Sequence, residues 1–115
     1  MSKSVLFAGA RTYEDHDTIV EAMVDMCDPG DTVVSGDTGG FASMVEESAT
    51  ALGFGFFVVD ETTHYVGNPG LPYPPNRDRT LVDEVDKVVT FGDKRATNHL
   101  RILADDRGIS VTHFD

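Results

Sequence analysis

Short blocks of consecutive apolar residues recur along the chain, and the longer segments between them carry apolar residues at every third or fourth position. An apolar run too short for a helix is typical of a strand buried on both faces. The blocks predict strands at Ser4–Ala8, Asp31–Ser35, Phe54–Val59, Lys87–Phe91 and Ser110–Phe114. The first, second and fourth blocks run directly into a glycine, which indicates a tight turn after the strand.

The longer segments have the spacing of amphipathic helices. The predicted helices span Glu14–Cys27, Gly40–Leu52, Arg77–Glu84 and Arg95–Arg107. The inward face of the first holds Ile19, Met23 and Met26, with Val20, Val24 and Cys27 beside them. The inward face of the second holds Phe41, Val45, Ser48, Ala49 and Leu52, and that of the last holds Ala96, Leu100, Leu103 and Ala104. Gly53 and Gly108 follow two of these helices, where a glycine commonly ends a helix.

Strands and helices alternate strictly, which predicts an α/β fold with a mainly parallel sheet. The 115 residues fit one domain, spanning residues 1–115. We therefore expect a single Rossmann-like domain with three layers, in which five mainly parallel strands carry helices on both faces. Such sheets bind ligands beyond the carboxyl ends of their strands, at the point where the strand order reverses.

The chain is strongly acidic, with 20 acidic residues against 9 lysines and arginines and a formal charge of −11. This charge repels phosphodiester backbones, so nucleic acids are disfavoured as partners. No apolar run approaches the ~20 residues that cross a bilayer, so we expect no membrane partner. The lone Cys27 fits a reducing, cytoplasmic setting, and its place on the apolar side of a helix indicates a core residue.

The turns that follow the predicted strands suit an anionic ligand. Glycines let the backbone approach a ligand, helix starts offer free N–H groups, and arginine grips a phosphate with two hydrogen bonds. The candidate ligand-binding residues are Gly9, Ala10, Arg11, Gly36, Asp37, Thr38, Gly39, Gly40, Arg77, Gly92 and Thr97. Five of the nine basic residues fall at or beside this edge, namely Arg11, Arg77, Arg79, Lys94 and Arg95. The alternative is that the turns need glycine for their conformation and that the arginines pair with neighbouring acids.

A proline-rich segment, Asp60–Asn76, fits no regular element, and a loop of this length in a small domain is often functional. We expect it to act as a lid, with Tyr65 and Tyr73 as candidates to stack on a base. Phe41 is a further stacking candidate, and core packing suits it equally. The acidic stretch Glu14–Asp17 predicts no metal site, because successive residues of a helix do not share a face.

These motifs resemble the SLOG superfamily of Rossmann-like nucleotide-binding domains, above all its small YspA-like branch from bacteria, phages and archaeal viruses. The resemblance covers nearly the whole chain. V-L-F-A-G-A-R-T-Y is similar to the first strand and its Gly-x-Arg turn, at Gly9 and Arg11. G-D-T-G-G-F-A-S-M-V-E-E-S-A-T-A-L-G is similar to the glycine-rich second motif. Arg77 stands in the place of the arginine of an Arg-Asn segment, and Thr97 in that of a final Gly-Thr. The resemblance implies a bound nucleotide or nucleotide derivative and no further cofactor.

Three positions depart from the family pattern. Ala42 replaces an aspartate of the second motif, Asp78 replaces an asparagine, and G-D-K-R-A-T replaces a glycine-rich last motif. The phosphoribohydrolases of the superfamily carry a glutamate after that last motif, and this chain has none there. The resemblance therefore favours binding over that hydrolysis.

Three functions stay open at this point. The favoured one is a binding module that senses or sequesters a signalling nucleotide. The second is a hydrolase of an N-glycosidic or phosphate bond, with Asp37 or Asp78 as the candidate catalytic residue and Asp60 as a carboxylate partner of Asp78. The third is an interaction scaffold without a ligand. A homo-oligomer would cover the edges of the sheet, but the sequence does not locate an interface.

Overall fold

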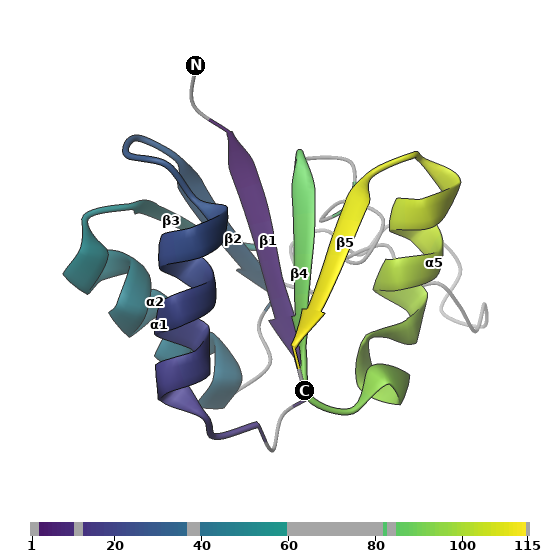
Figure 1. Ribbon diagram of the computed structural model, residues 1–115, viewed down its shortest axis with the longest axis horizontal. Coiled ribbons are helices and arrows are strands. Elements are labelled where there is room, and N and C mark those ends of the chain that lie inside the picture. Colours follow the sequence, from purple (N-terminus) through teal and green to yellow (C-terminus); the bar gives the residue numbers. More distant parts are fainter. Residues whose placement is uncertain (1–2, 11–12, 37–39, 60–81, 83–84, 115) are drawn as a thin grey trace.

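The computed structural model describes residues 3–10, 13–36, 40–59, 82 and 85–114. In chain order the elements are β1 (Ser4–Gly9), α1 (His16–Met26), β2 (Thr32–Gly36), α2 (Gly40–Leu52), β3 (Gly55–Val59), β4 (Lys87–Phe91), the 3₁₀ turn η1 (Lys94–Thr97), α5 (Asn98–Asp106) and β5 (Ser110–Phe114). The strands form one sheet in the order β3-β2-β1-β4-β5, and every pairing is parallel (Figure 1). The predicted α/β fold with a parallel sheet is confirmed.

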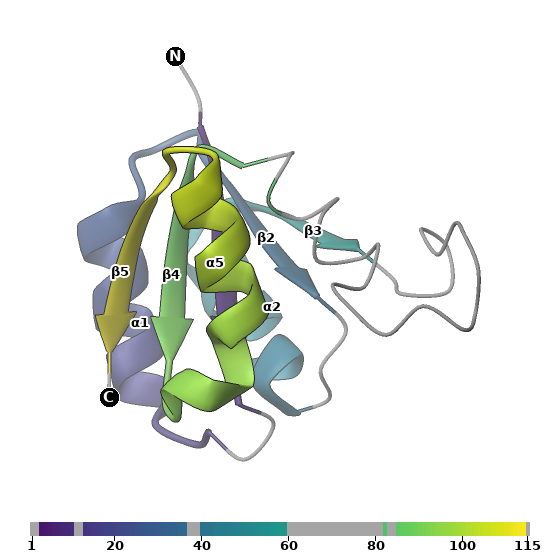
Figure 2. The ribbon, with the colours of Figure 1, turned by 90° about the vertical axis from the view of Figure 1, so that its right-hand side faces the viewer.

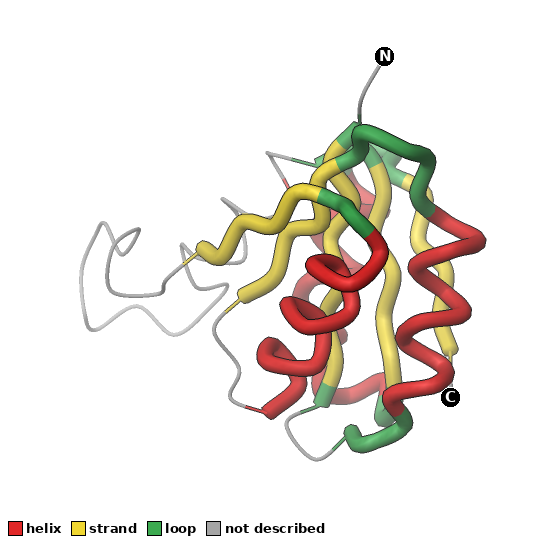
Figure 3. The backbone as a smooth tube through the Cα atoms, turned by 90° about the vertical axis from the view of Figure 1, so that its left-hand side faces the viewer, coloured by secondary structure: helices red, strands yellow, loops and turns green. Residues whose placement is uncertain are grey.

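The two faces of the sheet are covered by different helices. α1 and α2 lie together on one face (Figure 3), and α5 lies on the other (Figure 2). Because successive strand residues point to opposite faces, Phe7 of β1 is buried under α1 and α2, whereas Leu6 is buried under α5. Fully burying one such side chain contributes about 2 kcal/mol. The predicted three-layer arrangement is therefore confirmed.

The buried residues of the helices follow the predicted spacing, but Val24 and Leu52, which were predicted on or beside inward faces, are exposed. Val24 of α1 is exposed, although the sequence placed it beside the inward face. It lies about 100° around the helix from the buried Met23, beyond the stripe that reaches the sheet. Leu52 is also largely exposed, because it is the last residue of α2. Cys27 is buried in the core, as predicted.

The last predicted helix, Arg95–Arg107, is divided in two. Its first turn is the 3₁₀ turn η1, and the α-helix proper begins at Asn98. Of the helix predicted over Arg77–Glu84, Val82 is described and is buried under the α5 side of the sheet, and its other residues lie outside the described part. The Asp60–Asn76 segment, with Tyr65 and Tyr73, lies outside it too.

A buried carboxylate fastens the amino-terminal edge of the sheet. Asp31 accepts backbone hydrogen bonds from Lys3 and Asp28, both at 2.8 Å, and the Lys3 ammonium lies 3.8 Å from it. These groups, the Asp28 N–H above all, lower the pKa of the Asp31 carboxyl. The start of β1 and the turn before β2 are thereby held together, at the edge opposite the predicted site.

Candidate functional site

The carboxyl ends of all five strands meet at one edge, because every strand runs in the same direction (Figure 1). The strand order reverses between β1 and β4, so the fold places a switch point at this edge. Six of the sequence-predicted ligand residues are described, and they end or follow these strands: Gly9, Ala10, Gly36, Gly40, Gly92 and Thr97. The others lie outside the described residues: Arg11, Asp37, Thr38, Gly39 and Arg77, together with the catalytic candidate Asp78.

Gly9, at the end of β1, is required by packing. A Cβ atom at this position would lie 2.6 Å from Cε1 of Phe41 and 2.9 Å from two further atoms of the same ring. The Phe41 ring is fully buried and is the first large side chain of α2. Gly9 therefore lets α2 approach the end of β1, and Phe41 is a core residue rather than an exposed stacking surface.

Gly92, after β4, has a similar role on the neighbouring strand. Its φ of +82° is a conformation that other residues seldom adopt, and its Cβ position lies 3.0 Å from the Tyr13 ring. Tyr13, Phe41 and Phe91 pack with ring centroids 5.5 to 6.1 Å apart. This aromatic cluster fills the α1 side of the switch point. Sequence reasoning missed it, because Tyr13 lies in a turn and carries no periodic signal.

The start of α1 is occupied by carboxylates. The Asp15 side chain accepts hydrogen bonds from the Thr18 backbone N–H at 3.2 Å and from the Thr18 hydroxyl at 2.7 Å. The hydroxyl, more than the N–H, lowers the pKa of Asp15. Asp17 adds a second negative charge in the first turn. These charges repel an anion from this helix start, although a helix N-terminus by itself attracts one.

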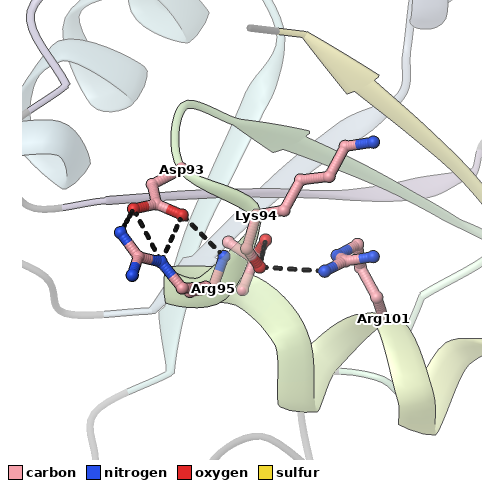
Figure 4. Close-up of polar contacts among 5 residues, drawn as sticks. Asp93, Lys94, Arg95 and Arg101 are labelled. Carbon is pink, nitrogen blue, oxygen red and sulfur yellow. Dashed lines mark hydrogen bonds and ion pairs between the residues drawn. The ribbon is translucent and has the colours of Figure 1, made fainter.

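The start of η1 is occupied in the same way. Asp93 accepts a hydrogen bond from the Arg95 backbone N–H at 2.9 Å, and the Arg95 guanidinium reaches the same carboxylate at 2.8 Å (Figure 4). This pairing lowers the pKa of the exposed Asp93 carboxyl to about 2. For Arg95, the structure therefore supports the alternative that edge arginines pair with neighbouring acids.

The other cation after β4 is Lys94, which is bound through its backbone and not through its side chain. Its backbone carbonyl accepts a hydrogen bond from Arg101 at 2.9 Å, while its own side chain points away from Asp93 (Figure 4). Lys94 is exposed, and among the described residues no carboxylate forms an ion pair with it. Of the two described cations predicted for this edge, Arg95 is paired with a carboxylate and Lys94 has no described carboxylate partner.

The described part of α2 begins at Gly40, and the residues that directly precede it lie outside the described part. Its first turn holds no acidic residue, and a Cβ atom at Gly40 would meet nothing within 4 Å. Gly36, at the end of β2, is buried, and the predicted glycine-rich turn joins the two. The first N–H groups of a helix have no carbonyl partner within it, and a helix start carries the positive end of the helix dipole, so a helix start without an acid can attract an anion.

Buried polar residues lie on the α5 side of the same edge. Thr97 is buried, and its hydroxyl donates to the Lys94 carbonyl at 3.5 Å, so this predicted ligand residue has a partner within its own turn. The Thr90 hydroxyl lies 2.7 Å from Nδ1 of His113, which faces it across β4 and β5. The sequence contained no signal for that pair, because it depends on the strand register.

Neither a metal centre nor a membrane span is found in the described part of the chain. No three His, Cys, Asp or Glu side chains described here come together as a group that would hold a metal ion. No described helix is long and apolar enough to cross a bilayer.

The fold is similar to that of a solved domain of low sequence identity. The C-terminal domain of a hydrogenase from Pyrococcus furiosus matches over 99% of this chain and 94% of that domain, with 16% identity and a TM-score of 0.49. No protein-family model matches the sequence, and no curated protein matches it either. The function of this chain is therefore inferred from its own residues and their geometry.

Proposed function

We propose that this protein binds a nucleotide or nucleotide-derived small molecule at the carboxyl edge of its sheet, with a phosphate group at the start of α2. One observation carries the proposal. Aspartates cap the starts of α1 and η1, at Asp15 and Asp93, and α5 follows η1 without a break, whereas the described first turn of α2 contains no acid. The two carboxylate caps favour the start of α2 over those of α1 and η1 as the anion site.

Electrostatics favours this position in an acidic protein. A phosphate beside Asp15 or Asp93 would lie against a fixed negative charge, whereas the α2 start presents N–H groups and the positive end of a helix dipole. Glycine at position 40 leaves the space beside the backbone open. Gly36 and Gly40 are therefore the described residues to which we assign a binding role. Gly9 and Gly92 have a packing role, because they make room for the rings of Phe41 and Tyr13.

The remaining parts of the ligand are assigned from the sequence. Asp37 and Thr38 fall within the turn between β2 and α2, where a ribose hydroxyl would meet a carboxylate. Arg11 and Arg77 supply guanidinium groups for the phosphate. The protein would then act as a sensor or a store of its ligand, since this chain lacks the glutamate of the phosphoribohydrolases it resembles.

Isothermal titration against nucleoside mono-, di- and triphosphates, cyclic nucleotides and ADP-ribose tests the proposal. We expect at least one of them to bind, and Gly40→Asp to weaken that binding 10-fold or more by placing a carboxylate at the phosphate position. Ser110→Asp is the matched control, because it adds the same charge at the exposed amino end of β5. An aspartate in the first turn of a helix is compatible with folding.

Two results would overturn the proposal. One is the absence of heat with every compound in a folded sample. The other is equal affinity of the Gly40→Asp and Ser110→Asp variants, which would exclude the start of α2 as the phosphate site. Chromatography of the titrated samples separates binding from hydrolysis, because turnover would convert the nucleotide to a product.

A further inference from the structure

Among the described strands, β3 and β5 lie at the two edges of the sheet, and they differ in what they expose. β5 carries Ser110, Thr112 and His113, and its apolar residues are partly buried. β3 is built from glycine, phenylalanine and valine alone, yet the Phe57 side chain is 52% exposed and Val58 40% exposed. Phe57 and Val58 point to opposite faces of the sheet, so apolar surface is left open on both sides of this strand.

An edge strand of this composition is unusual. Edge strands normally carry charged residues, proline or a bulge, which prevent pairing with another chain. β3 has none of these, although the chain carries 20 acidic residues elsewhere. The charge-free stretch extends back through the end of α2, from Ser48 to Val59, and includes the exposed Leu52.

We propose that β3 is the edge through which two copies of this chain pair, antiparallel, about a two-fold axis. Strand pairing of this kind is self-complementary, because one edge supplies both the donors and the acceptors. Since each copy has a charge of −11, most of its surface would bring carboxylates together in a dimer. The charge-free stretch at Ser48–Val59 lets two copies meet without burying carboxylates.

The surface beside β3 has room for a side chain from the second copy. A hollow of about 200 Å³ opens on the α5 face of β2 and β3 and is lined, among the described residues, by Ser4, Thr32, Val34 and Phe57. Across a two-fold axis at β3, the apolar side chains of each copy lie next to the hollow of the other. Phe57 of each copy therefore lies at the hollow of the other copy, and the two-fold axis makes the two contacts equivalent.

The dimer is expected to be weak. A pairing built on a strand of five residues buries less than the roughly 800 Å² per partner of a stable interface. Association should therefore depend on protein concentration, with a dissociation constant on the order of 10–100 μM. Salt should strengthen it, because screening reduces the repulsion between two acidic chains.

Sedimentation velocity from about 5 μM to 500 μM tests the pairing, using the whole chain. We expect the mass to rise from 12.5 kDa toward twice that value, and Phe57→Lys to weaken association 10-fold or more. The matched control is Ile102→Lys, since Ile102 is 57% exposed on α5 and the change in charge is the same. Circular dichroism establishes that both variants are folded.

Hydrogen exchange identifies the edge that pairs. At concentrations where the dimer forms, peptides covering residues 53–59 should gain protection and peptides covering residues 110–114 should not. A wild-type protein that stays monomeric up to 500 μM at high salt would overturn the proposal. So would a dimer that Ile102→Lys disrupts and Phe57→Lys leaves intact, or one whose protection appears in β5.

Discussion

Replacing Gly9 with alanine tests the packing at the switch point. The added methyl group would lie 2.6 Å from Cε1 of Phe41, well inside van der Waals contact. Phe41 cannot turn aside easily, because its ring is fully buried between Tyr13 and Phe91, with centroids at 6.1 and 5.6 Å. Overpacking of this kind costs about 1–3 kcal/mol, and the loss of glycine's freedom in the unfolded chain returns about 0.5 kcal/mol.

The net loss in the free energy of unfolding is therefore about 0.5–2.5 kcal/mol, and the Tm should fall by about 2–10 °C. Urea denaturation followed by circular dichroism measures it. The double variant Gly9→Ala/Phe41→Leu should recover at least 0.5 kcal/mol relative to the sum of the single variants, because the smaller side chain leaves room for the methyl group. Gly40→Ala is the control, since its Cβ meets nothing within 4 Å, and it should be as stable as wild type or up to about 1 kcal/mol more stable.

The reasoning would be refuted by a Gly9→Ala protein as stable as wild type, or by strictly additive effects in the double variant. The first result would mean that α2 does not lie against the end of β1 as described. The second would mean that the cost arises in the backbone of β1 and not at the Phe41 ring.

Two further predictions concern titrating groups far from the proposed ligand. Because hydrogen bonds from Asp28 and Lys3 lower the folded pKa of Asp31, its stabilisation is present above the unfolded pKa and is lost as pH falls. Asp31→Asn should thus cost about 1–3 kcal/mol at pH 7 and much less at pH 3 in urea titrations, whereas a pH-independent cost would contradict the assignment. Burial raises the pKa of Cys27 to about 11, so at pH 8 a thiol reagent should modify the folded protein about 100-fold more slowly than the unfolded chain. Rapid stoichiometric labelling of the folded protein would place Cys27 at the surface.

The local elements were predictable to a large extent. The bounds of α2, β4 and β5 agree with the sequence analysis, and β1, β2 and β3 differ from it by a residue at one or both ends. The glycines after two helices have the expected positive φ, +81° at Gly53 and +70° at Gly108. The exposed Val24 was not predicted, because spacing along a helix does not show how wide a stripe its neighbours cover.

The candidate site was predictable in kind but not in detail. Glycines and basic residues at strand ends located the edge, and Gly36 and Gly40 were among them. The sequence left open whether Arg95 binds an anionic ligand or pairs with a neighbouring acid. The side-chain geometry shows that it pairs with Asp93. The proposal of the α2 start as the phosphate site rests on the caps at Asp15 and Asp93, which the sequence did not single out.

What the sequence determined by itself is the order and kind of the elements, because apolar spacing, caps and glycine turns act between residues a few positions apart. Tertiary structure decided everything that joins distant segments. The reversal of strand order between β1 and β4, the contact of Gly9 with Phe41 and the facing of Thr90 and His113 are of this kind. Side chains far apart in sequence meet only when the helices and strands have packed, so no local pattern specifies which pairs will touch.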